Sequence, residues 1–320
     1  MKSVLEYLEN ISNDNKVIDK NGSITYKDLQ VVSKKIGSGL AKYVKNNDPV
    51  PVYMEKGISC LEVFMGSLYA GGFYSLLNAG LPKMRLEQII NVLDVDYVVT
   101  DNEHLESAKE FFPNKKLILY EDLVKCEVDD ELLSNIRARK LDVDPVYANF
   151  TSGSTGVPKG VVVGNRSIID FIDNFTSTFG INETDIIANQ APFDFDVSVK
   201  DIYPALKTGA TLVIVPKELF SRPAELIDFL VEHKVTTMTW AVSALCLIST
   251  FHGLDYKVPE TVKRVMFSGE VMPMKHLKEW MKHLPNATFV NLYGPTEITC
   301  NCTYHIIDRN REYEKIPVGV

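Results

Sequence analysis

The chain has 320 residues, of which 45% are hydrophobic and 24% are charged, and this length and composition favour a large or two-lobed globular α/β protein. Its formal net charge is -8, and an acidic surface argues against nonspecific nucleic-acid binding, which relies on lysine and arginine. Five cysteines without a CxxC pair and six histidines without an HExxH spacing argue against disulfide frameworks and zinc sites.

The N-terminal MKSVLEYLEN lacks a signal-peptide core and no run reaches the roughly 18 apolar residues of a membrane span, so we expect a cytoplasmic protein.

The first half of the chain alternates between predicted strands and predicted helices. Strands are predicted at 49–57, 73–78, 96–101 and 115–120. Amphipathic helices are predicted at 58–72, 82–94 and 103–112. This alternation predicts a parallel sheet with helices on both faces, followed by a charged connection or surface excursion over 121–145.

The alternation resumes after this charged stretch. Strands are predicted at 146–150, 159–165, 185–191, 210–216, 235–241, 262–269 and 287–294. Helices are predicted at 166–180, 197–209, 221–234, 242–253 and 272–285. Pro204 is expected to kink or restart the second of these helices. Because ligands of open α/β sheets bind beyond the carboxyl ends of the strands, the loops at Asp194, Ala241, Ser268 and Gly294 are the first candidates for a site.

The segment from Thr151 to Gly160 reads TSGSTGVPKG and joins two of the predicted strands. Its glycines allow backbone N–H groups to form an anion-binding nest, its hydroxyls add donors, and Lys159 adds a positive charge. It does not match the Walker A pattern. The composition alone leaves a linker and a phosphate clamp open, although a linker would lack the flanking strands. The candidate phosphate-binding residues are Thr151, Ser152, Gly153, Ser154, Thr155, Gly156 and Lys159.

A second motif, NLYGPTE, spans Asn291 to Glu297. A plain turn after a buried strand is one interpretation, because Gly-Pro marks such turns. On the functional interpretation, Tyr293 offers an aromatic face and Asn291 an amide to a nucleotide base. Thr296 can then donate to a phosphate, and Glu297 supplies the oxygen that Mg²⁺ prefers as a ligand.

A third motif, FDFDVS, places two aspartates among aromatic residues where a strand gives way to a helix. Asp194 or Asp196 could cap that helix. Alternatively, one of the carboxylates awaits a substrate cation in an apolar pocket, because a buried carboxylate without a partner is costly and a ligand ammonium would supply that partner.

The three motifs, in this order and at these distances, resemble those of the adenylate-forming enzymes, which include acyl-CoA synthetases, luciferases and amino-acid adenylation domains. SITYKDL, LYAGGFYSLLN and FSGEVMP are similar to further signatures of that superfamily, so the resemblance covers nearly the whole chain. FDVS resembles the amino-acid-activating branch. Within that branch the sequence is most similar to D-alanine–carrier protein ligases and nonribosomal peptide synthetase adenylation domains.

The resemblance implies two stacked, doubly wound α/β subdomains in a layered αβαβα arrangement, and a two-step reaction. The carboxylate of an amino acid attacks the α-phosphate of ATP, giving acyl-AMP and pyrophosphate, and a thiol of a phosphopantetheinyl carrier protein or of CoA then takes the acyl group. Lys159, Thr296 and a Mg²⁺ ion on Glu297 neutralise charge, and no residue forms a covalent bond. The implied nucleotide contacts are Gly269, Glu270, Asn291, Leu292, Tyr293, Gly294, Pro295 and Thr296.

The resemblance also implies a substrate pocket in which Asp196 holds the α-ammonium group. The other implied pocket residues are Phe195, Val197, Lys200, Thr239, Met266, Ser268, Leu292, Cys300 and Asn301. Lys200 departs from the family pattern, in which a small or apolar residue is more usual. Either its stem packs while its amine reaches solvent or pairs with Asp201, or the amine contacts a polar or acidic substrate side chain.

The superfamily continues beyond this point with a small barrel, a ribose-binding aspartate motif, a hinge and a mobile C-terminal domain that carries a catalytic lysine. We therefore expect an N-terminal fragment in which residues 316–320 begin a truncated barrel and the C-terminal domain is missing. Such a fragment should adenylate poorly, since losing one preorganised charge donor costs on the order of 10²–10³ in rate. The resemblance places one subdomain at 48–188 and the other at 1–47 plus 189–315, whereas the pattern alone suggests a cut near 145.

Two rival functions stay open at this point. An acyl-CoA or aryl-acid ligase would use the same chemistry without an ammonium group to hold, and Asp196 argues against it. A nucleotide-binding module without turnover is the more distant alternative.

Overall fold

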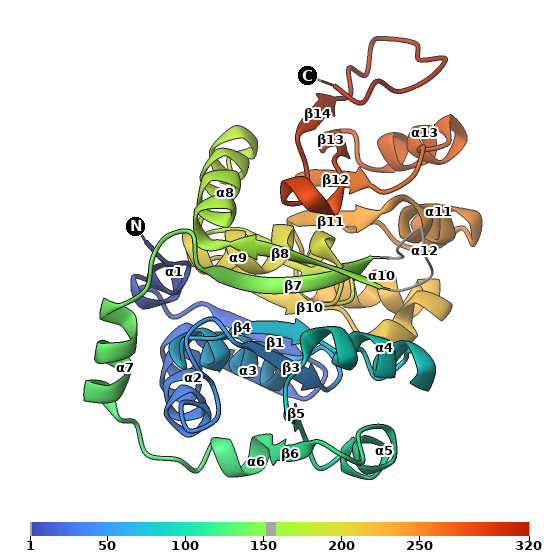
Figure 1. The fold of residues 1–320 in the computed structure, drawn as a ribbon. Coiled ribbons are helices and arrows are strands. Elements are labelled where there is room, and N and C mark those ends of the chain that lie inside the picture. The colour runs from blue at the N-terminus through green and yellow to red at the C-terminus, as the bar shows by residue number, and fades with distance from the viewer. Residues whose placement is uncertain (1, 152–157, 320) are drawn as a thin grey trace. The chain divides into compact units, whose positions relative to one another are not determined.

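The computed structural model describes residues 2–151 and 158–319, and the chain forms two compact units. Unit 1 comprises residues 1–14, 24–175 and 193–195, and unit 2 comprises residues 15–23, 176–192 and 196–320. Each unit contains one largely parallel sheet with helices packed on it (Figure 1), which confirms the predicted α/β class. The predicted subdomain boundaries near 48 and 188 and the stacking of the subdomains stay predictions.

The sheet of unit 1 has the strand order β6-β5-β3-β4-β7-β8. Its strands are β3 (Pro49–Tyr53), β4 (Phe73–Leu76), β5 (Tyr97–Thr100), β6 (Lys116–Leu119), β7 (Pro145–Thr151) and β8 (Lys159–Gly164). All neighbouring pairs are parallel except β7 and β8, which are antiparallel. The short TSGSTGVPKG connection explains this exception, because a parallel pair needs a much longer crossover.

Unit 1 contains several helices, two of which pack closely at a glycine. They are α1 (Leu5–Glu9), α2 (Tyr26–Leu40), α3 (Ile58–Tyr69), α4 (Lys83–Leu93), α5 (Leu105–Phe111), α6 (Tyr120–Leu123), α7 (Asp130–Ala138) and α8 (Asn165–Phe179), the last of which extends to residues of unit 2. Helices α2 and α3 approach closely at Gly66, where an added Cβ would lie 2.4 Å from the Cγ2 of Ile36. No helix in the described part of the chain has the length and apolar content needed to cross a membrane.

The sheet of unit 2 has the strand order β14-β13-β12-β11-β9-β10-β1-β2. Its strands are β1 (Lys16–Asp19), β2 (Gly22–Thr25), β9 (Ile186–Asn189), β10 (Thr211–Ile214), β11 (Thr237–Ala241), β12 (Arg264–Ser268), β13 (Thr288–Tyr293) and β14 (Thr303–Ile306). The strands from β1 to β13 in this order pair in parallel, and β14 is antiparallel to β13. The carboxyl ends of the central strands therefore meet at one edge of the sheet.

Alternate residues of these strands separate the two faces of the sheet. Met238, Trp240, Val265, Phe267 and Phe289 face a buried core shared with the helices that follow each strand. The helical elements of unit 2 are η1 (Asp196–Ser198), α9 (Val199–Thr208), η2 (Lys217–Ser221), α10 (Pro223–Glu232), α11 (Val242–Thr250), α12 (Gly253–Tyr256), α13 (Met274–His283) and η3 (Thr296–Ile298). Helix α9 runs through Pro204 without a break, so the predicted restart there is not found.

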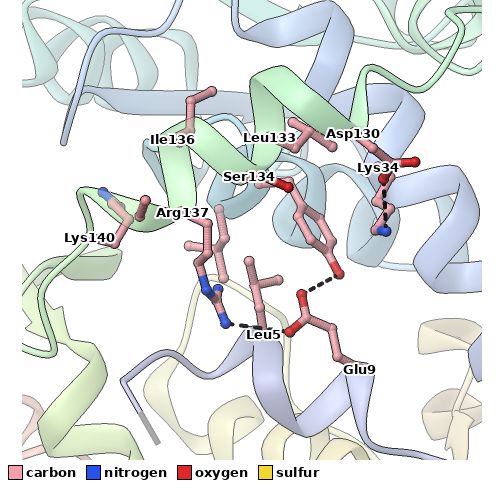
Figure 2. Close-up of a pocket in the computed structure, with 12 residues that line it drawn as sticks. Leu5, Glu9, Lys34, Asp130, Leu133, Ser134, Ile136, Arg137 and Lys140 are labelled. Atoms are coloured by element: carbon pink, nitrogen blue, oxygen red, sulfur yellow. Dashed lines mark hydrogen bonds and ion pairs between the residues drawn. The ribbon is translucent and has the colours of Figure 1, made fainter.

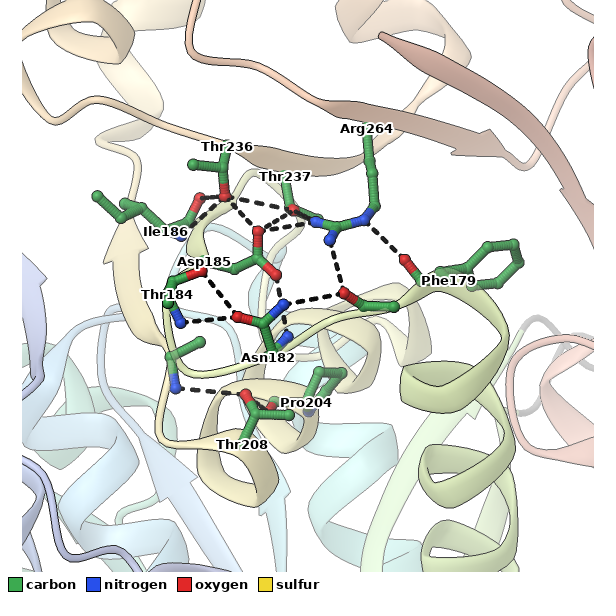
Figure 3. Close-up of polar contacts among 12 residues, drawn as sticks. Phe179, Asn182, Thr184, Asp185, Ile186, Pro204, Thr208, Thr236, Thr237 and Arg264 are labelled. Carbon is green, nitrogen blue, oxygen red and sulfur yellow. Dashed lines mark hydrogen bonds and ion pairs between the residues drawn. The ribbon is translucent and has the colours of Figure 1, made fainter.

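A buried ion pair joins the amino-terminal ends of three strands of unit 2 (Figure 3). The fully buried carboxylate of Asp185 accepts hydrogen bonds from Arg264 and Thr236, each at 2.8 Å. Arg264 also donates to Thr237 and to the backbone carbonyls of Phe179 and Gly180, each at 2.7 Å. Burial alone would raise the pKa of Asp185, but the bonds from Arg264, the Asn182 amide and Thr236 outweigh it and lower that pKa.

Candidate active site

The strand register of unit 2 places four predicted pocket residues on one face of the sheet. Thr239 is the register partner of Met266, and Ala241 is the partner of Ser268. Met266 pairs in turn with Val290, two residues before Leu292. Register partners in a parallel sheet share a face, as do residues two apart on a strand. Thr239, Met266, Ser268 and Leu292 therefore lie on the face opposite the core of α10, α11 and α13, and all four are buried.

Lys200, in the first turn of α9, reaches this face and is only 1% exposed. Its Nζ donates to Ser268 Oγ at 3.2 Å and to Asn301 Oδ1 at 2.7 Å. The amine is buried and does not reach solvent, so that part of the first interpretation is wrong. Asp201 accepts a hydrogen bond from Asn189 at 2.9 Å, and its charge acts on Lys200. Burial lowers the pKa of Lys200, and electrostatic attraction to the Cys300 sulfur, Asp196 and Asp201 opposes this shift.

Asp196 and Cys300 lie beside this lysine. Asp196 begins η1 and is partly exposed, and its backbone carbonyl accepts a hydrogen bond from Cys300 Sγ at 3.1 Å. Thr299 and Cys300 have φ angles of 67° and 74°, in the left-handed region that L-residues rarely adopt. Each such residue costs about 1–3 kcal/mol, so the surroundings of this turn must hold it in place. The turn delivers Asn301 to Lys200.

The turn at Thr299 and Cys300 also packs directly against the backbone of Gly294. A Cβ added there would lie 2.5 Å from the Cα of Asn301 and 2.7 Å from the backbone oxygen of Cys300. Both obstacles are backbone atoms, which cannot rotate away as a side chain can. Gly294 is therefore needed for the close approach of two backbone segments, independently of any contact with a ligand.

We expect Gly294→Ala to lower the free energy of unfolding by about 1–3 kcal/mol, the cost of forcing atoms into a packed site. Urea unfolding monitored by circular dichroism measures it. Gly180→Ala is the matched control for the loss of a glycine without a clash, because nothing lies within 4 Å of a Cβ there, although its φ of 61° adds some strain. A Gly294→Ala variant as stable as the wild type would show that the close approach at Gly294 carries no cost, and a loss in Gly180→Ala measures the backbone strain alone.

The predicted nucleotide contacts of unit 2 lie at the ends of β12 and β13. Tyr293 is 52% exposed, as a face offered to a base requires. Gly269 has a φ of 94°, so the chain turns sharply after β12, and Glu270 lines a hollow of about 410 Å³ beside α11. Asn291 already donates one amide hydrogen to the Pro317 carbonyl at 2.8 Å, which leaves its second amide hydrogen and its amide oxygen for a base edge.

The predicted phosphate loop belongs to unit 1. Thr151 ends β7 and pairs with the exposed Lys159 at the start of β8. Ser152, Gly153, Ser154, Thr155 and Gly156 lie outside the described residues. Sequence reasoning missed Arg85 in α4, which donates to the backbone carbonyl of Thr151 at 3.3 Å. The only signal that could have pointed to it is the pairing of β4 with β7, which a single sequence does not reveal.

Two further features lie apart from the predicted residues. In unit 1, a cavity of about 320 Å³ is lined by residues of α1, α2, α3 and α7 (Figure 2). Its charged groups pair with one another, Lys34 with Asp130 at 3.1 Å and Arg137 with Glu9 at 3.5 Å, so they offer little charge to a ligand.

Among the described residues, one cluster in unit 2 could hold a metal ion. The ligand atoms of Asp255, Glu279 and His283 lie within 4.8 Å of one another, but a hydrogen bond of 2.8 Å between His283 and Glu279 and a contact of 3.2 Å between His283 and Asp255 account for this geometry. Glu297, the predicted Mg²⁺ ligand, lies elsewhere, exposed in η3.

The parallel sheets and the buried polar cluster of Lys200, Ser268 and Asn301 beyond the carboxyl ends of strands are typical of α/β proteins that bind ligands there. The sequence profile of one family, described as AMP-binding enzyme, matches residues 8–320. The chain therefore belongs to the AMP-binding enzyme family, which confirms the family predicted from the motifs.

The similar curated proteins are longer than this chain. It is 32% identical over 307 residues to a D-alanine–D-alanyl carrier protein ligase of Bacillus velezensis, an alignment that covers 93% of this chain and 59% of that protein. It is 29% identical over 301 residues to the ligase of the same name from Lacticaseibacillus casei, covering 92% of this chain and 58% of that protein. The chain thus spans about three fifths of the length of these relatives.

Solved structures show the same fold. The nonribosomal peptide synthetase FmoA3, in a form bound to alpha-methyl-L-serine-AMP, has a TM-score of 0.89 at 23% identity, covering 99% of this chain and 36% of that one. The N-terminal subdomain of Klebsiella oxytoca NpsA, in complex with 3-hydroxybenzoyl-AMSN, has a TM-score of 0.81 at 19% identity, covering 100% and 80%. At these identities the likeness shows the fold alone.

Proposed function

We propose that this chain carries the ATP and amino-acid sites of an enzyme that activates an amino acid as aminoacyl-AMP, for transfer to the thiol of a carrier protein or of CoA. Family membership and the names of the relatives support the adenylation step. The observation that carries the amino-acid part is the position of Asp196. Its side chain is partly exposed, and its backbone carbonyl accepts a hydrogen bond at 3.1 Å from Cys300, the neighbour of the Asn301 that binds Lys200. A carboxylate in that position suits the α-ammonium group of an amino acid.

The reaction brings two anions together, and the proposed site residues would supply the positive charge that this requires. The amino-acid carboxylate and the α-phosphate of ATP repel each other, so the site must supply positive charge before they meet. On this proposal, Lys159 and the backbone of the loop that begins at Thr151 bind the phosphates, while Tyr293 packs against the adenine. The new bond joins the carboxylate oxygen to the α-phosphorus, and the bond to the departing pyrophosphate breaks.

A magnesium ion fits the donor set of η3. The hydroxyl of Thr296 and the exposed carboxylate of Glu297 are oxygen donors, which a hard divalent cation prefers. When bound, Mg²⁺ would offset negative charge on the phosphate oxygens. Thr296 and Glu297 lie a few residues before Asn301 in the sequence, so the same short segment would position both the phosphate end and the side-chain pocket.

The proposal is tested by calorimetric titration of the 320-residue chain with aminoacyl sulfamoyl adenosines, in which a stable sulfamate stands for the phosphate. These mimics need no second catalytic domain, because no bond is made or broken. We expect at least one member of a panel of proteinogenic amino acids and their D-enantiomers, D-alanine included, to bind with one-to-one stoichiometry. If the folded chain binds none of the panel, amino-acid adenylation is not the function of this site.

A further inference from the structure

The buried ammonium group of Lys200 has unused hydrogen-bonding capacity. An ammonium carries three N–H donors, and the structure uses two of them, on Ser268 and Asn301. Both acceptors are neutral oxygens, and no carboxylate among the described residues lies within 4.0 Å of the amine. The chain has therefore buried a positive charge without giving it a direct negative partner.

Such a charge is expensive to bury. A lone ionised group loses several kcal/mol of hydration in a protein interior, and neutral dipoles recover only part of it. The nearest aspartates act on Lys200 without forming a direct ion pair with it. Asp201 bonds to Asn189, and Asp196 would be taken up by the α-ammonium of the substrate on the function proposed above. Once an amino acid has taken up Asp196, Asp201 still acts on the Lys200 charge, but no carboxylate of the described residues forms a direct ion pair with the amine.

A second polar group on the same face also lacks a partner. The Oγ1 atom of Thr239 is fully buried and has no hydrogen-bond partner among the described residues. It lies on β11 two residues before Ala241, the register partner of Ser268, so it belongs to the same face as the oxygen that Lys200 contacts. A carboxylate accepts several hydrogen bonds through its two oxygens and would satisfy a hydroxyl and an ammonium together.

We propose that Lys200, held by Ser268 and Asn301, selects an α-amino acid whose side chain ends in a carboxylate. This inference rests on the proposed function and names its substrate class. The substrate α-ammonium pairs with Asp196 and the side-chain carboxylate pairs with Lys200, so each end of the amino acid meets the opposite charge. The alternative is that the side chain of Lys200 fills part of the pocket, so that only a small neutral substrate fits. The test below distinguishes the two.

The test compares sulfamoyl adenosines of aspartate and glutamate with those of their amides, asparagine and glutamine, and with the alanine analogue. Each acid and its amide have nearly the same shape, so the comparison isolates the charge. We expect one acidic analogue to bind the unmodified chain about 10- to 100-fold more tightly than its amide, as a charge-assisted hydrogen bond provides. Equal affinities, or tighter binding of a neutral analogue, overturn the inference without any variant.

The variant Lys200→Met keeps the length of the side chain and removes its charge. We expect it to abolish the preference for the acid by weakening the acidic analogue and sparing the amide. Lys207→Met is the matched control, because Lys207 lies in the last turn of the same helix and donates to Thr176 instead. An unchanged ranking in Lys200→Met overturns the inference while leaving the proposed function standing. If no aminoacyl analogue binds the unmodified chain, both fail together.

Discussion

Asp196→Ala is expected to weaken the binding of an aminoacyl sulfamoyl adenosine by about 30-fold to several thousand-fold, measured by calorimetry. Removing one member of a desolvated charge pair typically costs about 2–5 kcal/mol, because the other charge is left without a partner. The same variant should leave the desamino analogue, which has no ammonium group, with unchanged affinity. This selective loss is what separates an amino-acid site from a site for simple carboxylic acids.

Asp194→Ala is the matched control, since it lies two residues away in the same FDFDVS motif. Its carboxylate accepts a hydrogen bond from Asn78 at 3.0 Å, within unit 1. We expect it to leave the preference for the aminoacyl over the desamino analogue intact. Loss of that preference in Asp194→Ala but not in Asp196→Ala would mean that the substrate-binding aspartate has been assigned to the wrong member of the motif.

Asp185→Ala is expected to lower the free energy of unfolding by about 3–5 kcal/mol, because it leaves the guanidinium of Arg264 largely buried without its anion. Arg264 is 13% exposed and Asp185 is fully buried, so water cannot replace the lost partner well. Asp228→Ala removes an exposed pair with Lys257 at 2.7 Å and should cost no more than about 1 kcal/mol. Equal losses in urea unfolding would contradict the special role of the buried pair.

The same pair predicts a dependence on pH. The pKa of Asp185 is lowered in the folded protein, so the folded state holds its proton less tightly than the unfolded chain does. The stabilisation is therefore present above the unfolded pKa of about 3.9 and is lost as the pH falls through the folded value. The wild type should lose more stability than Asp185→Ala between about pH 5 and pH 3.

Much of the fold was accessible from the sequence because local patterns carry it. The apolar runs 73–78 and 235–241 contain β4 and β11, and the helical period of 58–72 contains α3. The charged stretch after Glu121 was expected only as a connection or surface excursion, yet it holds α6 and α7. In α7 an aspartate cap at Asp129 and a single buried residue, Leu133, replace a clear apolar stripe.

Long-range pairing was beyond the reach of a single sequence. Strand β1 pairs with β10, whose residues lie about 200 positions further along the chain, and no local pattern encodes that partnership. The same limit applies to the site. The motifs singled out Lys200, Ser268 and Asn301 separately, but their contact depends on the register of β12 and on the left-handed turn at Thr299 and Cys300. Sequence reasoning therefore left the location of the lysine amine open.

The comparison that tests the account most directly uses the unmodified chain and two ligands. One is the aminoacyl sulfamoyl adenosine that binds most tightly in the panel, and the other is its desamino counterpart, identical except for the missing amine. We predict that the dissociation constant of the aminoacyl ligand is at least about 30-fold lower than that of the desamino ligand, because only the aminoacyl ligand forms the charge pair with Asp196. Equal affinities, or a preference for the desamino ligand, would contradict an amino-acid site and favour a ligase of simple carboxylic acids.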